Sequence, residues 1–278
     1  MAVLHAAGAP LTTSGYTLLI ADDPTLVAAA QRLRHEVFAT ELGATLSPDD
    51  AGLDIDEFDA HCDHLVVLRE GTDEVVGTYR LLPPGRTERR YSDSEFDLTA
   101  LAPLRDDLVE AGRSCVHPDH RSGAVINLMW AGITRYLHLR GSRWLGGCAS
   151  VPVADGGTAA AEVWAQVTAR HLAPPPLRVT PVRPWFAEAA AGAVDPATLS
   201  PDGSGPGRGD RRAELELSPA ERRALVPPLL RGYLRLGAWV CGEPAYDPDF
   251  GCADFYVLFS LDRLNPRYLR HFLGGEPS

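Results

Sequence analysis

The residues best suited to chemistry lie between Val109 and Ile126. A carboxylate and a guanidinium, Glu110 and Arg113, are three positions apart in an apolar segment, which is followed by His117-Pro118-Asp119-His120-Arg121-Ser122-Gly123 and then by a helical pattern. Where a strand turns into a helix, unpaired backbone N–H groups at the helix start bind phosphate or another anion. The turn holds one glycine, so it is no dinucleotide-binding fingerprint.

The elements that must position these residues alternate between strands and helices. The last strand is almost continuously apolar, which is typical of a central position in a sheet. The order predicts an α/β fold with a mixed central β-sheet flanked by helices. We expect strands at 16–21, 64–69, 74–82, 108–116, 144–150 and 254–261, and helices that begin at Pro24 or cover 124–139 and 158–171.

The spacing of Glu110 and Arg113 requires an irregular strand if both are to act on one ligand. Three residues is an odd step, so in a regular strand their side chains point to opposite faces of the sheet. A β-bulge between them would bring them to one face. We place that bulge at Gly112.

Other clusters have simpler interpretations. The acidic stretch 49–59 is typical of a solvated loop, although Leu53, Ile55 and Phe58 are interleaved in it and predict an ordered one. The His and Asp residues at 61–64 and 117–120 match no zinc spacing, so we predict no metal site. In a strand, Cys148 is better explained as a small buried hydrophobe than as a nucleophile.

Composition excludes several classes of protein. The chain has 278 residues, a net charge of −11 and no lysine, because all 26 basic residues are arginine. This excludes Schiff-base, Walker and kinase lysines, and the acidic balance argues against nucleic acid as a partner. Five scattered cysteines, no signal peptide and no long apolar run predict a cytoplasmic protein without a membrane-spanning helix. We expect one domain over 1–278, with a Pro/Gly-rich surface insertion at about 173–212.

Taken together, several segments resemble the GNAT-like ornithine N-acyltransferases, also called hemolysin-like, and their relatives the acyl-homoserine-lactone synthases. None of the segments would be specific alone. They are Arg34-His35-Glu36-Val37-Phe38, Asp54-Ile55-Asp56-Glu57-Phe58-Asp59, Cys62-Asp63-His64-Leu65, Val76-Gly77-Thr78-Tyr79-Arg80-Leu81-Leu82, Tyr91-Ser92 with Glu95-Phe96-Asp97-Leu98, Gly112-Arg113-Ser114-Cys115-Val116, Gly147-Cys148-Ala149-Ser150 and Pro228–Ala238.

The resemblance implies a sheet that is splayed open between the strands at 108–116 and 144–150, with the pantetheine arm of a thioester in the splay. It also implies a set of site residues. The catalytic ones would be Glu110 and Arg113, the substrate-binding ones Arg34, Phe38, Asp56, Asp59 and Arg80, and those around the phosphopantetheine Val116, Arg121, Ser122, Gly123, Ala124, Val125 and Cys148.

The implied reaction is transfer of a (3-hydroxy)fatty acyl group from acyl carrier protein (ACP) to the α-amine of ornithine or a similar amino acid, as in ornithine-lipid synthesis. The amine must lose a proton, for which Glu110 is the candidate base. Arginines would orient the acceptor's carboxylate, Asp56 and Asp59 its side-chain ammonium, and a strand N–H beside the bulge the oxyanion.

No tightly bound cofactor is expected, because the phosphopantetheine thioester is a co-substrate. The single glycine in the turn favours ACP over coenzyme A (CoA), and ACP would dock on arginines around the site.

The alternatives are a CoA-dependent acetyltransferase acting on a small amine and a non-catalytic acyl-thioester-binding protein. Peripheral association with the inner face of the membrane is compatible with a product that carries one long chain. The docking arginines would be Arg86, Arg89, Arg90, Arg121, Arg135, Arg140 and Arg143.

Overall fold

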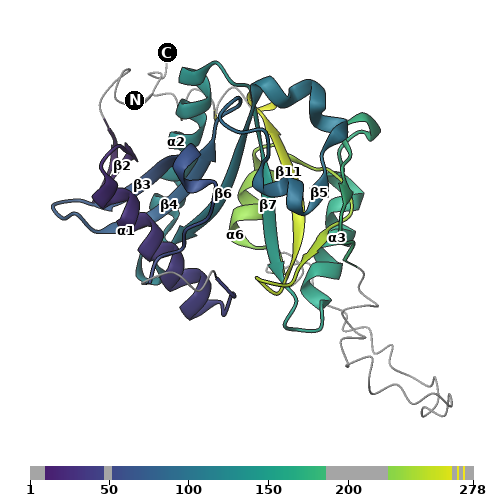
Figure 1. The fold of residues 1–278 in the computed structure, drawn as a ribbon, viewed down its shortest axis with the longest axis horizontal. Helices are drawn as coiled ribbons and strands as arrows, with labels where there is room; N and C mark the ends of the chain where they lie inside the picture. Colours follow the sequence, from purple (N-terminus) through teal and green to yellow (C-terminus); the bar gives the residue numbers. More distant parts are fainter. Residues whose placement is uncertain (1–9, 47–51, 186–224, 265–267, 269–271, 273–278) are drawn as a thin grey trace, which may run out of the picture.

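A mixed sheet runs through the molecule, in the order β1-β2-β3-β4-β6-β7-β11-β10 with β9 paired to β11 (Figure 1). The computed structural model describes residues 10–46, 52–185 and 225–264, with 268 and 272. A separate ribbon joins β5 (Phe96–Asp97) to β8 (Thr180–Pro181). The strands of the large sheet are β1 (Leu11–Thr13), β2 (Tyr16–Ala21), β3 (Asp63–Arg69), β4 (Val75–Leu82), β6 (Leu108–Val116), β7 (Trp144–Pro152), β9 (Trp239–Val240), β10 (Ala245–Asp247) and β11 (Cys252–Ser260).

Helices cover both faces of the sheet. The alternation along β3 shows this, because Leu65 and Val67 pack with α2 (Gly123–Arg140) while Val66, between them, packs with α1 (Pro24–His35). We call the side that carries α1 the front face and the side that carries α2 the back face. None of the helices in the described part of the chain is long and apolar enough to cross a membrane. This part of the chain contains several further helices. They are a π-helix (Glu36–Glu41), α3 (Thr158–Arg170), α6 (Pro228–Arg235) and 3-10 turns at Asp59–His61, Tyr91–Ser94, Thr99–Asp107, Pro118–His120, Pro175–Leu177 and Leu261–Arg263.

The sheet splays open between β6 and β7. These strands run parallel and pair only at Leu108–Trp144, Val109–Leu145 and Glu110–Gly146, although both continue for six more residues. Their facing edges are therefore unpaired with each other beyond Glu110. Unpaired strand edges offer backbone N–H and C=O groups to an extended ligand. This arrangement confirms the expected position of the splay.

The β-bulge in β6 lies just beyond the start of the splay. Thr78 pairs with Cys115 and Arg80 with Gly112, so one step of two on β4 faces a step of three on β6. The bulge was expected, but its placement at Gly112 is wrong by one residue. Arg113 takes the positive φ, +51°, and is the only non-glycine residue of the described chain to do so.

The other expected elements are present with small shifts at their ends, and β11 lies inside the sheet as its apolar pattern predicted. The prediction of a surface insertion at about 173–212 is wrong for residues 173–185. Residues 173–185 pack into the fold, since Ala173, Val179 and Trp185 are buried and β8 pairs with β5. Residues 186–212 lie outside the described part of the chain.

Gly147 is required where β6 and β7 separate, because a Cβ there would collide with the carbonyl oxygen of Ala111. We expect Gly147→Ala to lower the free energy of unfolding by about 3 kcal/mol, measured by urea denaturation. Gly112→Ala is the matched control. Its Cβ would meet nothing within 4 Å, so we expect a change within about 0.5 kcal/mol. Equal midpoints for the two variants would contradict this account of the splay.

Candidate active site

A cavity of about 580 Å³ opens around the point where β6 and β7 part. It brings together Glu110 and Arg113, as the bulge requires, with Phe38, Arg80 and Cys148. Nine of the expected site residues do not line this cavity, namely Arg34, Asp56, Asp59, Val116, Arg121, Ser122, Gly123, Ala124 and Val125.

Three arginines and three aspartates form a closed ring of alternating charges beside the cavity, and we call it the charge ring. Each arginine contacts two aspartates, and each aspartate contacts two arginines. The pairs are Arg34–Asp54 (2.8 Å), Arg34–Asp59 (2.9 Å), Arg80–Asp59 (2.9 Å), Arg80–Asp56 (2.6 Å), Arg113–Asp56 (3.4 Å) and Arg113–Asp54 (3.1 Å).

The charge ring ties four separate segments together. Arg34 comes from α1, Arg80 from β4 and Arg113 from the bulge of β6, while the aspartates come from the loop that precedes β3. Asp59 also accepts a hydrogen bond from the backbone N–H of Asp56 (2.9 Å), which closes the loop on itself. Asp54 was not expected among the site residues, although it lies in the same acidic run as Asp56 and Asp59.

Membership of the charge ring decides what its residues can do. Arg34 is 0% exposed and bound to two carboxylates, so it has no surface for a substrate. Burial alone would raise the pKa of Asp59, but Arg34 and Arg80 outweigh it and hold that pKa at about 2. Asp56 and Asp59 are thus already paired with guanidinium groups, and neither is a free anion that waits for an ammonium.

Arg113 occupies the edge of the charge ring that faces the cavity. Its guanidinium lies between two aromatic rings, 4.7 Å from the centroid of Tyr91 and 5.1 Å from that of Phe250. Stacking and two ion pairs fix its orientation. Burial lowers its pKa, but Tyr91 and Asp54 raise it above its ordinary value, so the charge is permanent.

Glu110 sits at the last paired position of β6, and its side chain projects into the cavity. One carboxylate oxygen accepts from the backbone N–H of Tyr91 and the other from that of Ser92, both at 3.0 Å. These two groups are the unpaired donors at the start of the 3-10 turn Tyr91–Ser94. Each carboxylate oxygen keeps a second lone pair, so the anchored carboxylate can still accept a proton from a ligand.

The start of α2 lies outside this cavity. Arg121 forms a two-pronged ion pair with Glu41 (2.6 and 2.7 Å) and donates to the carbonyl of Val116 (3.1 Å). Ser122 caps the helix without a side-chain hydrogen bond, which leaves the first backbone N–H groups for another partner. Val125 is fully buried in the core, so only its backbone could meet a phosphopantetheine.

None of the seven arginines expected around the mouth of the site lines the cavity itself, although Arg121 pairs with Glu41, which does. Arg90 is buried and donates to backbone carbonyls. Exposed carboxylates engage Arg89, Arg121 and Arg143, while Arg86 and Arg140 share Asp63. Because it is buried, Arg90 cannot belong to a docking surface.

Cys148 borders the cavity from β7, and its thiol donates to the hydroxyl of Ser92 (3.4 Å). Burial and the nearby carboxyl of Glu95 raise the pKa of Cys148 well above its ordinary range. The thiol is therefore protonated at neutral pH and is a poor nucleophile. Sequence analysis gave no role to Glu95 or Asp254, which lie beside it, although a single acid in the apolar strand β11 was the available signal.

Comparisons with known proteins agree with this geometry. The model of the acetyltransferase (GNAT) domain matches residues 33–131. The L-ornithine N(alpha)-acyltransferase of Rhodobacter capsulatus is 35% identical over 273 residues, which cover 94% of this chain and 95% of that protein. The chain belongs to the L-ornithine N(alpha)-acyltransferase family. The member from Brucella abortus is 31% identical and covers 92% of this chain and 88% of its own.

Membership of the L-ornithine N(alpha)-acyltransferase family makes this protein an acyltransferase with a GNAT fold and confirms the resemblance seen in the sequence. Among solved structures, a CoA-dependent acyl-homoserine lactone synthase with SAM and isopentyl-CoA matches with a TM-score of 0.50. It is 16% identical, and the match covers 91% of this chain and 84% of that one. At that identity the likeness shows the fold alone.

Removal of one acid from the charge ring should destabilise this family member strongly. In Asp59→Asn, Arg34 and Arg80 each lose a charged partner while they remain buried, which costs about 3–5 kcal/mol of unfolding free energy. Glu57→Gln is the control in the same loop, because its ion pair with Arg89 is exposed on both sides and is worth under about 1 kcal/mol. Similar losses in the two variants, measured by urea denaturation, would contradict a structural role for the charge ring.

Acid should unfold the wild type through the same ring. The folded-state pKa of Asp59, about 2, is lower than that of an unfolded chain, about 3.9. Its ionised form therefore stabilises the fold above about pH 4, and this contribution is lost as the pH falls toward 2. Unfolding free energies at pH 6, 4 and 3 should fall more steeply for wild type than for Asp59→Asn. Parallel curves would exclude Asp59 as the titrating group.

Proposed function

We propose that this protein transfers a fatty acyl group, 3-hydroxylated in its natural donor, from a phosphopantetheine thioester to the α-amine of ornithine or a similar amino acid. The observation that carries the proposal is the anchored carboxylate of Glu110 at the start of the splay, where an unpaired strand edge and a cavity meet. The names of the curated relatives support the acceptor.

In the proposed reaction, the α-ammonium of the acceptor gives one proton to Glu110, and the free amine attacks the thioester carbonyl. An amino acid is mostly protonated at neutral pH, so this proton must be removed before the nitrogen lone pair can attack. The tetrahedral intermediate collapses to an amide and a thiolate. The thiolate leaves readily because it is a weak base. The nitrogen that attacked still carries one extra proton, which passes to the departing sulfur, and Glu110 releases the first proton to water.

Arg113 and Arg80 are the guanidinium groups of the charge ring that reach the cavity, so we assign the acceptor's α-carboxylate to them. A guanidinium matches a carboxylate with two parallel hydrogen bonds. The oxyanion of the intermediate would accept from a backbone N–H on the edge of β6 that β7 leaves unpaired. Since Cys148 stays protonated, we propose direct transfer without an acyl-enzyme.

For the donor, we propose that the pantetheine arm lies along the unpaired edges of β6 and β7 and that its phosphate meets the start of α2 (Ser122, Gly123, Ala124). That helix start has free N–H groups but a single glycine, which favours the exposed phosphopantetheine of ACP over the larger CoA. A product with one long chain partitions into a bilayer, so we place the enzyme peripherally at the inner face of the membrane.

The decisive assay offers the purified protein L-ornithine with 3-hydroxyacyl-ACP or with the matching acyl-CoA, and identifies the products by mass spectrometry. We expect N-alpha-acylornithine in both reactions, with a kcat/KM at least about tenfold higher for acyl-ACP. A preference for acyl-CoA would overturn the choice of donor. No N-acyl product across a panel of amino acids would overturn the function.

Glu110→Gln should lower kcat by about 100-fold or more while the KM for the thioester changes little, because the variant lacks the base. Gln keeps one hydrogen-bond acceptor, but its NH2 group faces the other backbone N–H of the turn, so part of the loss can also come from the turn. The readout that separates the two roles is the pH profile. The rate of the variant should recover as the pH passes the pKa of the acceptor's amine, whereas damage to the turn would not be repaired by alkali.

A further inference from the structure

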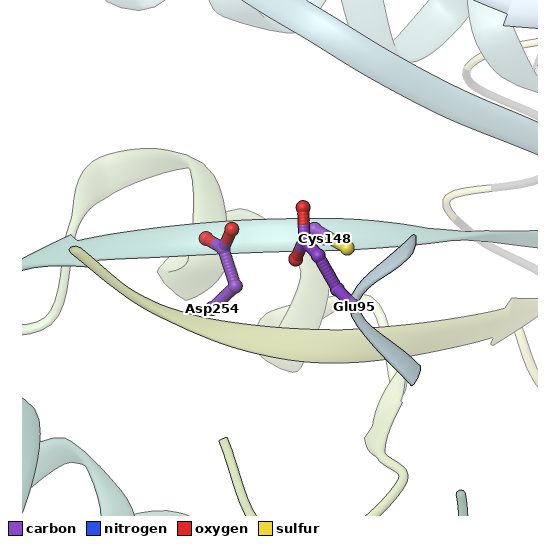
Figure 2. Close-up of side chains that lie close together, drawn as sticks. All are labelled: Glu95, Cys148 and Asp254. Carbon is purple, nitrogen blue, oxygen red and sulfur yellow. The ribbon is translucent and has the colours of Figure 1, made fainter. Parts of the chain in front are cut away.

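A second group of acids lies on the front face of the sheet, beyond Cys148 as seen from Glu110. Figure 2 shows Glu95, Cys148 and Asp254 close together. Their possible ligand atoms all lie within 4.8 Å of one another. Asp247 and Cys252 continue the group on the other side of Asp254. We call Glu95 and Asp254 the acid pair. Asp254, Asp247 and both cysteines line the same cavity as Glu110.

The acid pair differs from the aspartates of the charge ring because it has no cation. Glu95 is 8% exposed and Asp254 is 2% exposed, yet within the described part of the chain neither forms an ion pair with an arginine or a histidine. Neither oxygen of Glu95 has a geometrically good hydrogen-bond partner there. Glu95 instead meets Asp254 and Cys148, so two buried carboxyls face each other without a positive charge. That arrangement is costly unless a proton or a cation lies between them.

The electrostatics of the acid pair favour a cation. Burial and the nearby Asp254 raise the pKa of Glu95 to about 10, and burial also raises the pKa of Asp254. The empty pair therefore holds a proton at neutral pH. A positively charged group between the two carboxyls would replace that proton and satisfy both side chains.

The neighbouring thiols argue against a metal ion as this cation. Burial raises the pKa of Cys148 and of Cys252 well above the ordinary range of a thiol. A metal binds the thiolate, so both would have to be deprotonated in a buried, acidic environment. An ammonium group, in contrast, needs only carboxylate oxygens as hydrogen-bond acceptors and no thiolate.

The acid pair is connected to the proposed base by a short path. The backbone N–H of Ser92 donates to Glu110 (3.0 Å), and its hydroxyl accepts from Cys148 (3.4 Å), which touches the pair. Glu110, Cys148 and Asp254 project from the same face of the sheet. Their neighbours along the strands point the other way, into the core on the back face, and these are Val109, Ala111, Ala149, Ala253 and Phe255. A small molecule in this cavity can therefore meet Glu110 at one end and Asp254 at the other, where Glu95 lies within 4.8 Å of Asp254 and Cys148.

We propose that Glu95 and Asp254 bind the side-chain ammonium of a diamino-acid acceptor while Glu110 acts on its α-amine. This inference rests on the proposed function and names the residues that select the acceptor. It also replaces Asp56 and Asp59 in that role, since the charge ring already neutralises them. The carbon chain of the diamino acid would span the front of Ser92 and Cys148.

The first test compares L-ornithine with L-norvaline, which has the same carbon chain but ends in a methyl group. A site built around an ammonium leaves its acids unpaired with norvaline and should discriminate against it by about 100-fold or more in kcat/KM. Equal use of the two amino acids by the wild type would overturn the proposal without any variant.

The second test uses the isosteric variants Glu95→Gln and Asp254→Asn. Each should lower kcat/KM for ornithine by at least about tenfold and leave norvaline within about threefold, so turnover of norvaline also shows that the variant is folded. Asp97→Asn is the matched control, because Asp97 is exposed on β5 two residues from Glu95 and caps the turn at Thr99. Its ornithine-to-norvaline ratio should equal that of wild type.

The remaining outcomes are also decisive. Equal losses for both amino acids in both variants would make the pair merely structural and overturn the proposal. A rise in melting temperature with Zn²⁺ or Mn²⁺, together with an unchanged ratio in the variants, would overturn it in favour of a metal site. If neither amino acid is acylated with any donor, the proposed function itself fails, whereas acylation without selectivity defeats this inference alone.

Discussion

The closed ring of three arginines and three aspartates is the interaction on which the rest of the site depends. Four buried and two half-buried charges are tolerated because each has two partners of opposite sign, and the ring as a whole is neutral. The ring also explains the strain in β6. Arg113 adopts a positive φ, which is unfavourable for a residue with a side chain, and two ion pairs with stacking on Tyr91 compensate for it.

Carboxylate side chains have opposite roles on the two sides of the cavity. In the ring, aspartates are held ionised by guanidinium groups and serve to position a loop. Across the cavity, Glu110 is held only by backbone N–H groups, and Glu95 with Asp254 has no cation within the described chain. Neutral backbone donors orient a carboxylate without cancelling its charge, so it remains available to a positively charged substrate.

Sequence patterns predicted the strands, the main helices and the need for a bulge, because these follow from local periodicity and side-chain parity. They placed the bulge at Gly112, between Glu110 and Arg113, whereas in the structure Arg113 itself is the irregular residue and reaches Asp54 and Asp56. The resemblance identified most members of the ring but not their partners. Which acid meets which arginine depends on contacts between distant segments, and spacing along the chain carries no information about them. Asp254 was visible only as an acid in an apolar strand.

The bulge and the splay are two parts of one irregularity. The ladder between β6 and β7 ends at Glu110, and the extra residue of the bulge enters β6 three positions later. An inserted residue increases the local twist of its strand, which turns β6 away from β7 and keeps the edges apart. Gly147 lets the backbones touch at Ala111 before they diverge. The carboxylate at the last paired position therefore lies at the narrow end of the opening. A regular ladder would leave neither an unpaired edge for a thioester nor a shared face for Glu110 and Arg113. The proposed acyl transfer therefore depends on the part of the sheet where β6 and β7 do not pair.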